Sequence, residues 1–439
     1  MFVEKFFMKK SFGESVHISS TNRLFFMFMM FMWVASVSTY TSFNFGKNPV
    51  LMPIFIAILI YFYGKFCRKS FVPLALFLFV FFVWNILNLF KYSGFIGTNF
   101  PIFYSVLIAH VALNIYTGSE FFEYFERILV FFCLVSLIVW GMSNFWDGFL
   151  NVAEALSVIE RNPPTETYSF LFGLGTQVEA GFRRNIGFTW EPGRFSCWCL
   201  LGIYVNLVRH KFKITPLKNN KGFYILLVSL LTTFSTTGYF VMFLLLFFYF
   251  KNKKSFLVKF LLISLSICVL PIILSLPFML DKVVELLDPN LGYEEVYEYG
   301  IKKGYDTVTP QRFSGILFSC SNFLNDFWLG YNKIERSYIS VLLGTVVTPS
   351  EGIFYMLARY GFLVGIFLYV CLIKSSFFWA EKMHYKGGLM FFVLFIALSF
   401  SYEFWENCIF MVFYLSSFYV FFDKRYLDED RSIAKTVVV

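Results

Sequence analysis

Apolar blocks about as long as a bilayer-crossing helix follow one another along most of this chain. They lie at about 24–41, 50–64, 71–90, 100–116, 127–145, 194–208, 222–250, 255–276, 352–373, 387–402 and 407–422. A helix needs roughly 20 apolar residues to cross the hydrocarbon core of a membrane. Only 15% of the 439 residues are charged, whereas about a quarter are charged in a typical soluble domain. The sequence therefore predicts an all-α polytopic membrane protein and argues against a soluble enzyme, a nucleic-acid binder or a disordered scaffold.

The breaks between the apolar blocks are short except for two, at residues 146–193 and 277–351. The first block, from Leu24 to Tyr40, is long for the core of a signal peptide and lacks a small-residue cleavage site after it. We therefore expect it to be retained as the first span. The chain is predicted to form a single transmembrane domain, residues 1–439, which carries two large loops at 146–193 and 277–351.

Basic residues predict the orientation, because the cytoplasmic loops of membrane proteins are rich in lysine and arginine. Four of them precede the first apolar block and place the N-terminus in the cytoplasm: Lys5, Lys9, Lys10 and Arg23. This bias also explains the net charge of +9. We therefore expect no nucleic-acid partner.

The longest apolar block, at 222–250, conflicts with this rule if it forms one span, because the lysines after it would then face outward. Its middle also carries residues typical of a turn, from Ser235 to Gly238. We therefore predict two short segments, at about 222–234 and 239–250, that enter the membrane and return. The result is about twelve transmembrane segments, two of them short, with both termini cytoplasmic and both large loops on the outer side.

Arginines in the two outward loops are the first candidates for a ligand site. They are Arg183, Arg184, Arg194, Arg312 and Arg336. The planar fork of donors on a guanidinium group is well suited to phosphate and pyrophosphate. The alternative is that each arginine pairs with a nearby acid or with a lipid headgroup.

Arg359 is a candidate because of its depth in the membrane. It lies about seven residues into the span that begins near Gly352, which corresponds to roughly 10 Å at 1.5 Å per residue. A charged group at that depth costs at least a few kcal/mol and normally faces a polar cavity or a partner. We favour a functional role for Arg359 over the alternative, in which its side chain extends back to the outer headgroups.

Glu191 and Pro192 mark the point where the first large loop enters its next span. Proline is common at the first position of a helix, and the N-terminus of a helix offers free backbone donors to an anion. A carboxylate beside such a site can act as general base for a sugar hydroxyl. Alternatively, Glu191 caps the helix and pairs with Arg194.

Three motifs in this part of the chain resemble a known family. The first is Arg-x-x-Gly-x-x-x-Glu-Pro-Gly at 184–193, and the second is Thr-Thr-Phe-Ser-Thr-Thr-Gly-Tyr at 232–239. The third runs from Arg312 through Phe-Trp-Leu-Gly at 327–330 to Arg-Tyr-Gly at 359–361. Their order and spacing resemble the Wzy-type polymerases of O-antigen and exopolysaccharide, in the bacterial O-antigen ligase/polymerase superfamily. The resemblance covers roughly residues 180–370, and the earlier part of the chain is similar only in hydropathy.

The resemblance implies a glycosyltransferase of the bacterial inner membrane whose active site faces the periplasm. Such an enzyme joins oligosaccharide repeat units carried on undecaprenyl pyrophosphate, with the lipid pyrophosphate as leaving group and without a metal or cofactor. Its partners would be the lipid-linked oligosaccharide, membrane lipid and a chain-length regulator protein. The resemblance assigns catalytic roles to Glu191, Arg312 and Arg359. It assigns pyrophosphate binding to four further arginines: Arg183, Arg184, Arg194 and Arg336.

Two other functions stay open. O-antigen ligases commonly carry a histidine just before the span that follows the second large loop, where this chain has Glu351 and no histidine. This difference favours a polymerase over a ligase, and it makes Glu351 a second candidate base beside its ordinary role as a helix-start acid. A flippase for lipid-linked oligosaccharides would also have about twelve spans, but such transporters tend to show two related halves. We find no half of this sequence echoed in the other.

Other polar residues receive ordinary roles. We expect His110, within a span, to be a hydrogen-bonded buried histidine and not a proton relay. Cys197 and Cys199 are expected to be buried thiols, because no second pair is present to complete a zinc site. Glu403 and Glu406 lie near the outer end of the last hairpin, where they face either a glycan groove or water.

Overall fold

The structure is a computed structural model of the 439-residue chain. It describes residues 20–35, 72–92, 100–116, 118–146, 148–156, 167–168, 171–175, 177–179, 181–251, 291–331, 333–349 and 351–422. The apolar blocks predicted at 50–64 and 255–276 lie outside the described residues.

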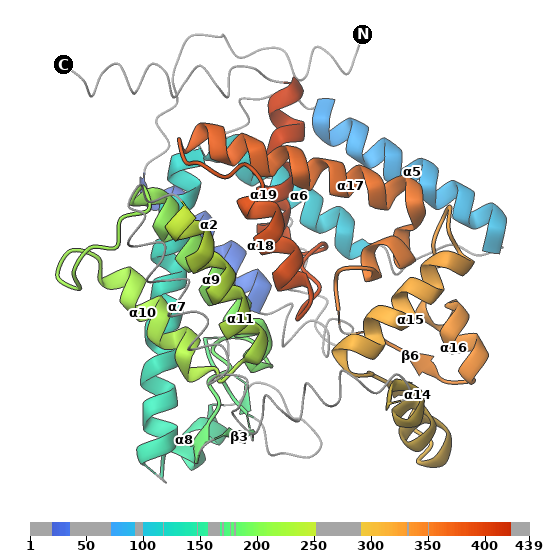
Figure 1. The fold of residues 1–439 in the computed structure, drawn as a ribbon, viewed down its shortest axis with the longest axis horizontal. Coiled ribbons are helices and arrows are strands. Elements are labelled where there is room, and N and C mark those ends of the chain that lie inside the picture. The colour runs from blue at the N-terminus through green and yellow to red at the C-terminus, as the bar shows by residue number, and fades with distance from the viewer. Residues whose placement is uncertain are drawn as a thin grey trace.

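Apolar helices form the main body of the molecule (Figure 1). In chain order they are α2 (Ser20–Ala35), α5 (Val72–Tyr92), α6 (Phe100–Ile115), α7 (Gly118–Phe145), α9 (Pro192–Arg209), α10 (Lys221–Thr232), α11 (Thr236–Lys251), α17 (Tyr355–Lys382), α18 (Met390–Ser399) and α19 (Cys408–Phe422). In the described part of the chain, three of them, α5, α7 and α17, are long and apolar enough to cross a membrane. The fold is therefore compatible with the helical membrane protein that the sequence predicts. The total of about twelve segments stays a prediction.

Helix α9 lies at the centre of this body. Every residue from Phe195 to Val208 is buried, and α7, α10 and α11 all pack against it. Helix α19 packs against α6 and α17. Burial all round explains why α9 has no charged side chain between its first turn and Arg209.

The longest apolar block forms two helices, α10 and α11, so the predicted division is confirmed. Between them Phe234 has a φ of 47°, in the left-handed region that turns the chain. The start of α10 lies beside the end of α9, where Asn206 and Asn220 exchange side-chain hydrogen bonds of 3.0 and 2.9 Å. Just after the end of α10, Ser235 accepts a hydrogen bond from Ser196 in the first turn of α9. Helix α10 therefore runs antiparallel to α9, and the chain turns back at the N-terminal end of α9.

The start of one helix, α7, differs from the prediction. Helix α7 begins at Gly118, well before the apolar block predicted at 127–145, so the acidic segment from Glu120 onward is helical. Its carboxylates have partners on other helices, because Glu120 pairs with Arg23 of α2 and Glu126 with Arg209 of α9. Hydropathy marks only the apolar part of a helix, and these ion pairs allow α7 to continue beyond it.

The first large loop, between α7 and α9, contains a short helix and two strand pairs. They are α8 (Phe149–Ala155), β1 (Thr167–Tyr168), β2 (Gly173–Leu174), β3 (Val178–Glu179) and β4 (Phe182–Arg183). Strands β1 and β2 pair antiparallel, as do β3 and β4. Figure 1 shows α8 and β3 near the end of α7. The all-α prediction therefore needs a correction for short strands in the loops, whose backbone groups pair locally.

The second large loop has a small hydrophobic core of its own. Its elements are α14 (Leu291–Val296), the π-helix η3 (Tyr297–Lys302), β5 (Thr307–Val308), α15 (Arg312–Asn325), the 3₁₀-helix η4 (Ile334–Arg336), α16 (Tyr338–Leu343) and β6 (Val346–Val347). Strands β5 and β6 pair in parallel. The core contains Val296, Val308, Phe318, Ile339 and Val347. Because α15 also packs against α17, this loop is attached to the main body.

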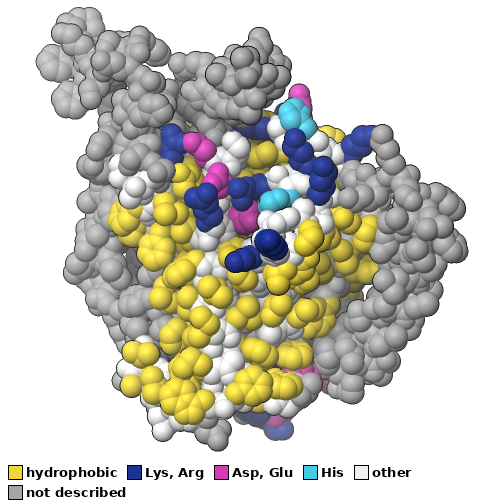
Figure 2. All heavy atoms as spheres, turned by 90° about the vertical axis from the view of Figure 1, so that its left-hand side faces the viewer, with side chains coloured by type: hydrophobic (Ala, Val, Ile, Leu, Met, Phe, Trp, Pro, Cys, Tyr) yellow, Lys and Arg dark blue, Asp and Glu magenta, His cyan; other side chains and the backbone are white. Residues whose placement is uncertain are grey.

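The surface separates apolar from charged side chains. Figure 2 shows a face covered largely by hydrophobic side chains, with basic and histidine side chains gathered toward one end. The α9–α10 connection carries exposed lysines, such as Lys211 and Lys218, and the bias of basic residues predicts that it is cytoplasmic. An apolar surface bounded by charge is what a membrane-embedded protein requires.

Candidate functional site

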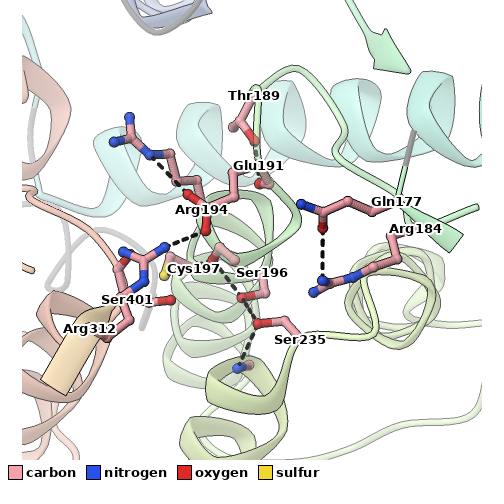
Figure 3. Close-up of polar contacts among 12 residues, drawn as sticks. Gln177, Arg184, Thr189, Glu191, Arg194, Ser196, Cys197, Ser235, Arg312 and Ser401 are labelled. Atoms are coloured by element: carbon pink, nitrogen blue, oxygen red, sulfur yellow. Dashed lines mark hydrogen bonds and ion pairs between the residues drawn. The ribbon is translucent and has the colours of Figure 1, made fainter. Parts of the chain in front are cut away.

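An ion pair joins the two large loops at the start of α9. Glu191 directly precedes the helix with an extended backbone, and Pro192 is its first residue, as the sequence predicts. The Glu191 carboxylate makes no capping hydrogen bond. It pairs instead with Arg312 through one oxygen, and its other oxygen lies 3.7 Å from Nε of Arg194 (Figure 3).

Arg312 connects this ion pair to the last helical hairpin. It is the first residue of α15, and its second guanidinium nitrogen donates a hydrogen bond to the carbonyl oxygen of Ser401. Ser401 belongs to the segment at 400–407 that joins α18 to α19, which we name the α18–α19 turn. The side chains of Arg312 and Glu191 remain 23% and 33% exposed, so a ligand can reach both groups.

The charge state of Glu191 is fixed by its neighbours. Burial opposes ionisation of the carboxyl group, but the positive charges of Arg312 and Arg194 outweigh burial. The pKa of Glu191 therefore lies below its ordinary value. A carboxylate in this state is a good ion-pair partner and a weak base.

Two aromatic rings hold Arg194 in place. Its guanidinium carbon lies 3.6 Å from the centroid of the Trp190 ring and 3.9 Å from that of the Tyr402 ring. A guanidinium group between two ring faces is held by cation–π attraction, which fixes its plane. Arg194 is therefore positioned before any ligand arrives.

Gly193 leaves space beside the Glu191–Arg312 pair. A Cβ atom on this residue would lie 3.1 Å from Oγ of Ser401, 3.4 Å from Oε1 of Glu191 and 3.9 Å from Nη2 of Arg312. A larger residue would fill the space between the ion pair and the first turn of the helix. The N–H groups in the first turn of a helix lack intrahelical partners and attract anions. The arrangement combines two guanidinium groups with such a helix start.

Arg359 forms a second ion pair with the α18–α19 turn. Its Nη1 lies 3.1 Å from Oε1 of Glu406 and also donates to the hydroxyl of Tyr355. The hydroxyl of Tyr360 donates to the same oxygen of Glu406. The sequence predicts that Arg359 faces a polar cavity or a partner. In the structure this partner is Glu406, an acid of the last hairpin. Both Arg312 and Arg359 reach the same turn.

The two parts of the third motif are in contact. The amide of Phe362 donates to the carbonyl of Phe327 at 2.7 Å, and Gly361 between the two halves of α17 has a φ of 71°. A Cβ on Gly361 would overlap the carbonyl oxygen of Trp328. The 327–330 segment therefore lies directly against the turn of α17 that carries Arg359.

Arg184 joins the first motif to the second. Its Nε and Nη2 donate to the carbonyls of Thr233 and Phe234, both at 3.0 Å, in the break between α10 and α11. Its Nη1 donates to the side chain of Gln177 at 2.9 Å (Figure 3). The bonds to Thr233 and Phe234 hold the turn between the two short helices close to the segment that precedes α9. The bond to Gln177 fixes Arg184 to the first large loop.

The two other predicted arginines lie apart from the Glu191 cluster. Arg183 is on β4 and donates to the carbonyl of Gly175 at 3.3 Å, while its own carbonyl accepts a hydrogen bond from Trp140 of α7. Arg336 is in η4 and donates to the carbonyl of Tyr92 at the end of α5. The Arg336 side chain therefore ties its loop to α5, whereas Arg183 contacts α7 through its backbone.

The ordinary roles predicted for other polar residues fit the structure. Glu351 is fully buried and accepts a hydrogen bond from the amide of Phe354 at 3.0 Å, as a helix-start acid does. His110 is buried and lies 2.8 Å from the hydroxyl of Tyr419. Cys197 and Cys199 are buried free thiols. Within the described ranges, no group of three or more His, Cys, Asp or Glu side chains could hold a metal ion.

The main contribution that sequence reasoning missed is the α18–α19 turn. Its residues Ser401, Tyr402 and Glu406 contact Arg312, Arg194 and Arg359 respectively. The available signal was the pair of acids, Glu403 and Glu406, in an otherwise apolar hairpin.

Comparison with models of known protein families, with curated proteins and with solved structures finds no match to this chain. The described residues form a mostly helical fold that is compatible with a helical membrane protein, with an arginine-rich charged cluster at the start of a buried helix. The resemblance to the Wzy-type polymerases rests on the three motifs alone.

Proposed function

We propose that this protein is a glycosyltransferase that polymerises oligosaccharide repeat units carried on undecaprenyl pyrophosphate, at the periplasmic face of the bacterial inner membrane. The observation that carries the proposal is the cluster of Glu191, Arg194 and Arg312 at the start of α9. Departure of a lipid pyrophosphate requires positive charge around its oxygens. Two guanidinium groups and a helix N-terminus supply that charge.

The proposed reaction uses this arrangement. The hydroxyl of one repeat unit gives its proton to a general base as its oxygen attacks the anomeric carbon of the chain on the other lipid, and the bond from that carbon to the pyrophosphate oxygen breaks. The electron pair leaves with the lipid pyrophosphate, whose growing charge Arg194 and Arg312 stabilise. Glu191 holds Arg312 in position until pyrophosphate oxygens take its place as the partner of that guanidinium group.

The second ion pair has a supporting role in this proposal. Arg359 and Glu406 hold the α18–α19 turn against α17, and that turn provides the carbonyl of Ser401 and the ring of Tyr402 to the two arginines. Loss of the Arg359–Glu406 pair would therefore displace both arginines together.

The test is the surface-glycan profile of a strain that lacks this gene, complemented with the wild-type chain, Arg312→Ala, Arg312→Lys or Lys333→Ala. Lys333 is exposed in the same loop and serves as the control. A polymerase predicts loss of the polymer ladder in the deletion strain and with Arg312→Ala, while a single repeat unit still reaches its acceptor. Lys333→Ala should restore the full ladder. Arg312→Lys should restore little of it, because a lysine cannot present two donors in a plane.

The other outcomes identify the other functions. Polymer that accumulates on the lipid carrier without reaching its acceptor would establish a ligase. Repeat units trapped at the inner face would establish a flippase. An unchanged profile in the deletion strain would overturn the proposal.

A further inference from the structure

A group of unsatisfied polar atoms lies next to the charged cluster. Among the described residues, the buried atoms without a hydrogen-bond partner include Tyr331 Oη, Glu351 Oε1, Glu403 Oε1 and Arg194 Nε. A buried polar atom without a partner costs about 1–3 kcal/mol. Several such atoms in one region of a structure point to a polar ligand that completes their hydrogen bonds.

The fold brings these four residues together from four segments. Gly352, the residue after Glu351, contacts the last hairpin. The amide of Gly352 donates to the carbonyl of Ser399 at 2.7 Å, and the carbonyl of Gly352 accepts a hydrogen bond from Trp405 in the α18–α19 turn. A Cβ on Gly352 would lie only 3.0 Å from Cα of Glu403. The backbones that carry Glu351 and Glu403 are therefore neighbours.

Tyr331, Arg194 and Arg359 lie in the same region as Glu351 and Glu403. The amide of Tyr331 donates to the carbonyl of Ala358 at 3.0 Å, one residue before Arg359. The Glu403 carboxyl group is within electrostatic reach of Arg359 from α17 and of Arg194 from α9. Tyr331 in turn is within reach of Arg359, Glu403 and Glu351. We name the region formed by Arg194, Tyr331, Glu351, Arg359 and Glu403 the inner polar site.

The inner polar site has the chemistry of a sugar-binding site. A guanidinium N–H and a tyrosine hydroxyl can donate, and the carboxyl oxygens of Glu351 and Glu403 can accept. Sugar hydroxyls need donors and acceptors side by side, because each hydroxyl both gives and takes hydrogen bonds. A pyrophosphate has a better site beside it, where Arg194 and Arg312 face the single carboxylate of Glu191.

We propose that the inner polar site binds the acceptor sugar of the incoming repeat unit and that Glu403 takes the proton from its attacking hydroxyl. This inference rests on the glycosyl transfer proposed above. The acceptor oxygen forms its bond to the anomeric carbon while its proton passes to an oxygen of Glu403. The bond between that carbon and the pyrophosphate oxygen breaks, and the lipid pyrophosphate leaves with the electron pair. Glu403 later returns the proton to water.

Glu403 is better suited to this step than Glu191. The Glu191 carboxylate is held by two guanidinium groups, which lower its affinity for a proton. Burial and the neighbouring Glu406 raise the pKa of Glu403 to about 8, although Arg359 and Arg194 act in the opposite direction and Glu351 adds to the rise. A general base is most effective when its pKa lies near the working pH.

The experiment uses the full-length protein in liposomes with lipid-linked repeat units extracted from the deletion strain. Chain growth is followed on gels for the wild type, Glu403→Gln, Glu403→Asp, Arg312→Ala and the exposed control Glu154→Gln. Glu403→Gln should lower the rate of chain growth by about 100-fold or more, the usual loss when a general base is removed. Glu154→Gln should match the wild type, because its side chain lies at the surface of α8.

The pH profile separates a base from a structural residue. The wild-type rate should rise between pH 6 and pH 9 as Glu403 loses its proton, and Glu403→Asp should shift the midpoint of that rise. A Glu403→Asp profile with an unchanged midpoint, or a wild-type rate for Glu403→Gln, would overturn the inference. If Arg312→Ala is inactive in the same assay, the proposed function still stands. If Arg312→Ala also grows chains at the wild-type rate, the proposed function itself fails.

Discussion

Arg312, the first residue of α15, forms an ion pair with Glu191, which lies 121 residues earlier in the chain and directly precedes α9. This one contact joins the two large loops, and the bond from Arg312 to Ser401 adds the last hairpin. The charged cluster is therefore an assembly of three distant segments around the N-terminus of a buried helix. Its geometry depends on the tertiary fold and not on any one motif.

The Glu191–Arg312 pair should show energetic coupling. We expect Glu191→Gln and Arg312→Gln each to lower the stability by about 1–3 kcal/mol, because each leaves a partly buried charge without its partner. The double variant should lose less than the sum, by about 1 kcal/mol. The measurement is a double-mutant cycle of melting temperatures in detergent. The exposed pair of Glu298 and Lys302 is the matched control and should show coupling near zero. Strictly additive losses at Glu191 and Arg312 would contradict the pairing.

Arg184 should stabilise the break between α10 and α11. Its guanidinium group donates to two successive carbonyls there, next to the left-handed Phe234. We expect Arg184→Ala to lower stability by about 1–3 kcal/mol and Arg184→Lys to recover little of the loss, since one ammonium cannot replace the planar fork. Arg127→Ala is the control, with a side chain that is 62% exposed and an expected loss below about 0.5 kcal/mol. Equal melting temperatures for Arg184→Ala and the wild type would refute this role.

Gly361 should be intolerant of any side chain. Its φ of 71° with a ψ of −179° is a conformation that only glycine normally adopts and that costs another residue about 1–3 kcal/mol, and a Cβ atom would also overlap the carbonyl of Trp328. Gly361→Ala should therefore lower the melting temperature and stop chain growth by displacing Arg359. Gly141→Ala, where a Cβ meets nothing within 4 Å, should leave both unchanged. A stable and active Gly361→Ala variant would show that the turn in α17 is not required.

The sequence predicts most helices because hydropathy reports directly on which segments avoid water. The break at Ser235 is also predictable, since turn residues and the charge rule agree there. The acidic start of α7 was missed for a physical reason. Glu126 is stabilised by Arg209, which lies 83 residues away in the chain, and no local pattern reveals such a partner.

The candidate site is predictable only in part. Glu191 and Arg194 are close in the sequence, so their proximity follows from one helix start. The partners of Arg312 and Arg359 are set by long-range packing of the loops on the last hairpin. Arg184 was assigned to pyrophosphate from its residue type, but its donors are engaged by backbone carbonyls of the second motif. Residue type alone does not distinguish an arginine that binds a ligand from one that holds a turn.

Glu191 and Glu403 should make the stability of the protein depend on pH in opposite directions. The pKa of Glu191 is lowered in the folded state, so its contribution is present above its unfolded pKa of about 4.3 and is lost as the pH falls. The pKa of Glu403 is raised to about 8, so the folded state binds its proton more tightly and loses stability as the pH rises from about 4.3 to 8. Glu403→Gln should therefore melt at least about 2 °C above the wild type at pH 9, although it grows chains about 100-fold more slowly. At pH 4 the two should melt together. Glu191→Gln should melt below the wild type at pH 7 and approach it at pH 3. A Glu403→Gln variant that melts below the wild type at pH 9 would show that the buried carboxylate is stabilised, in conflict with its raised pKa.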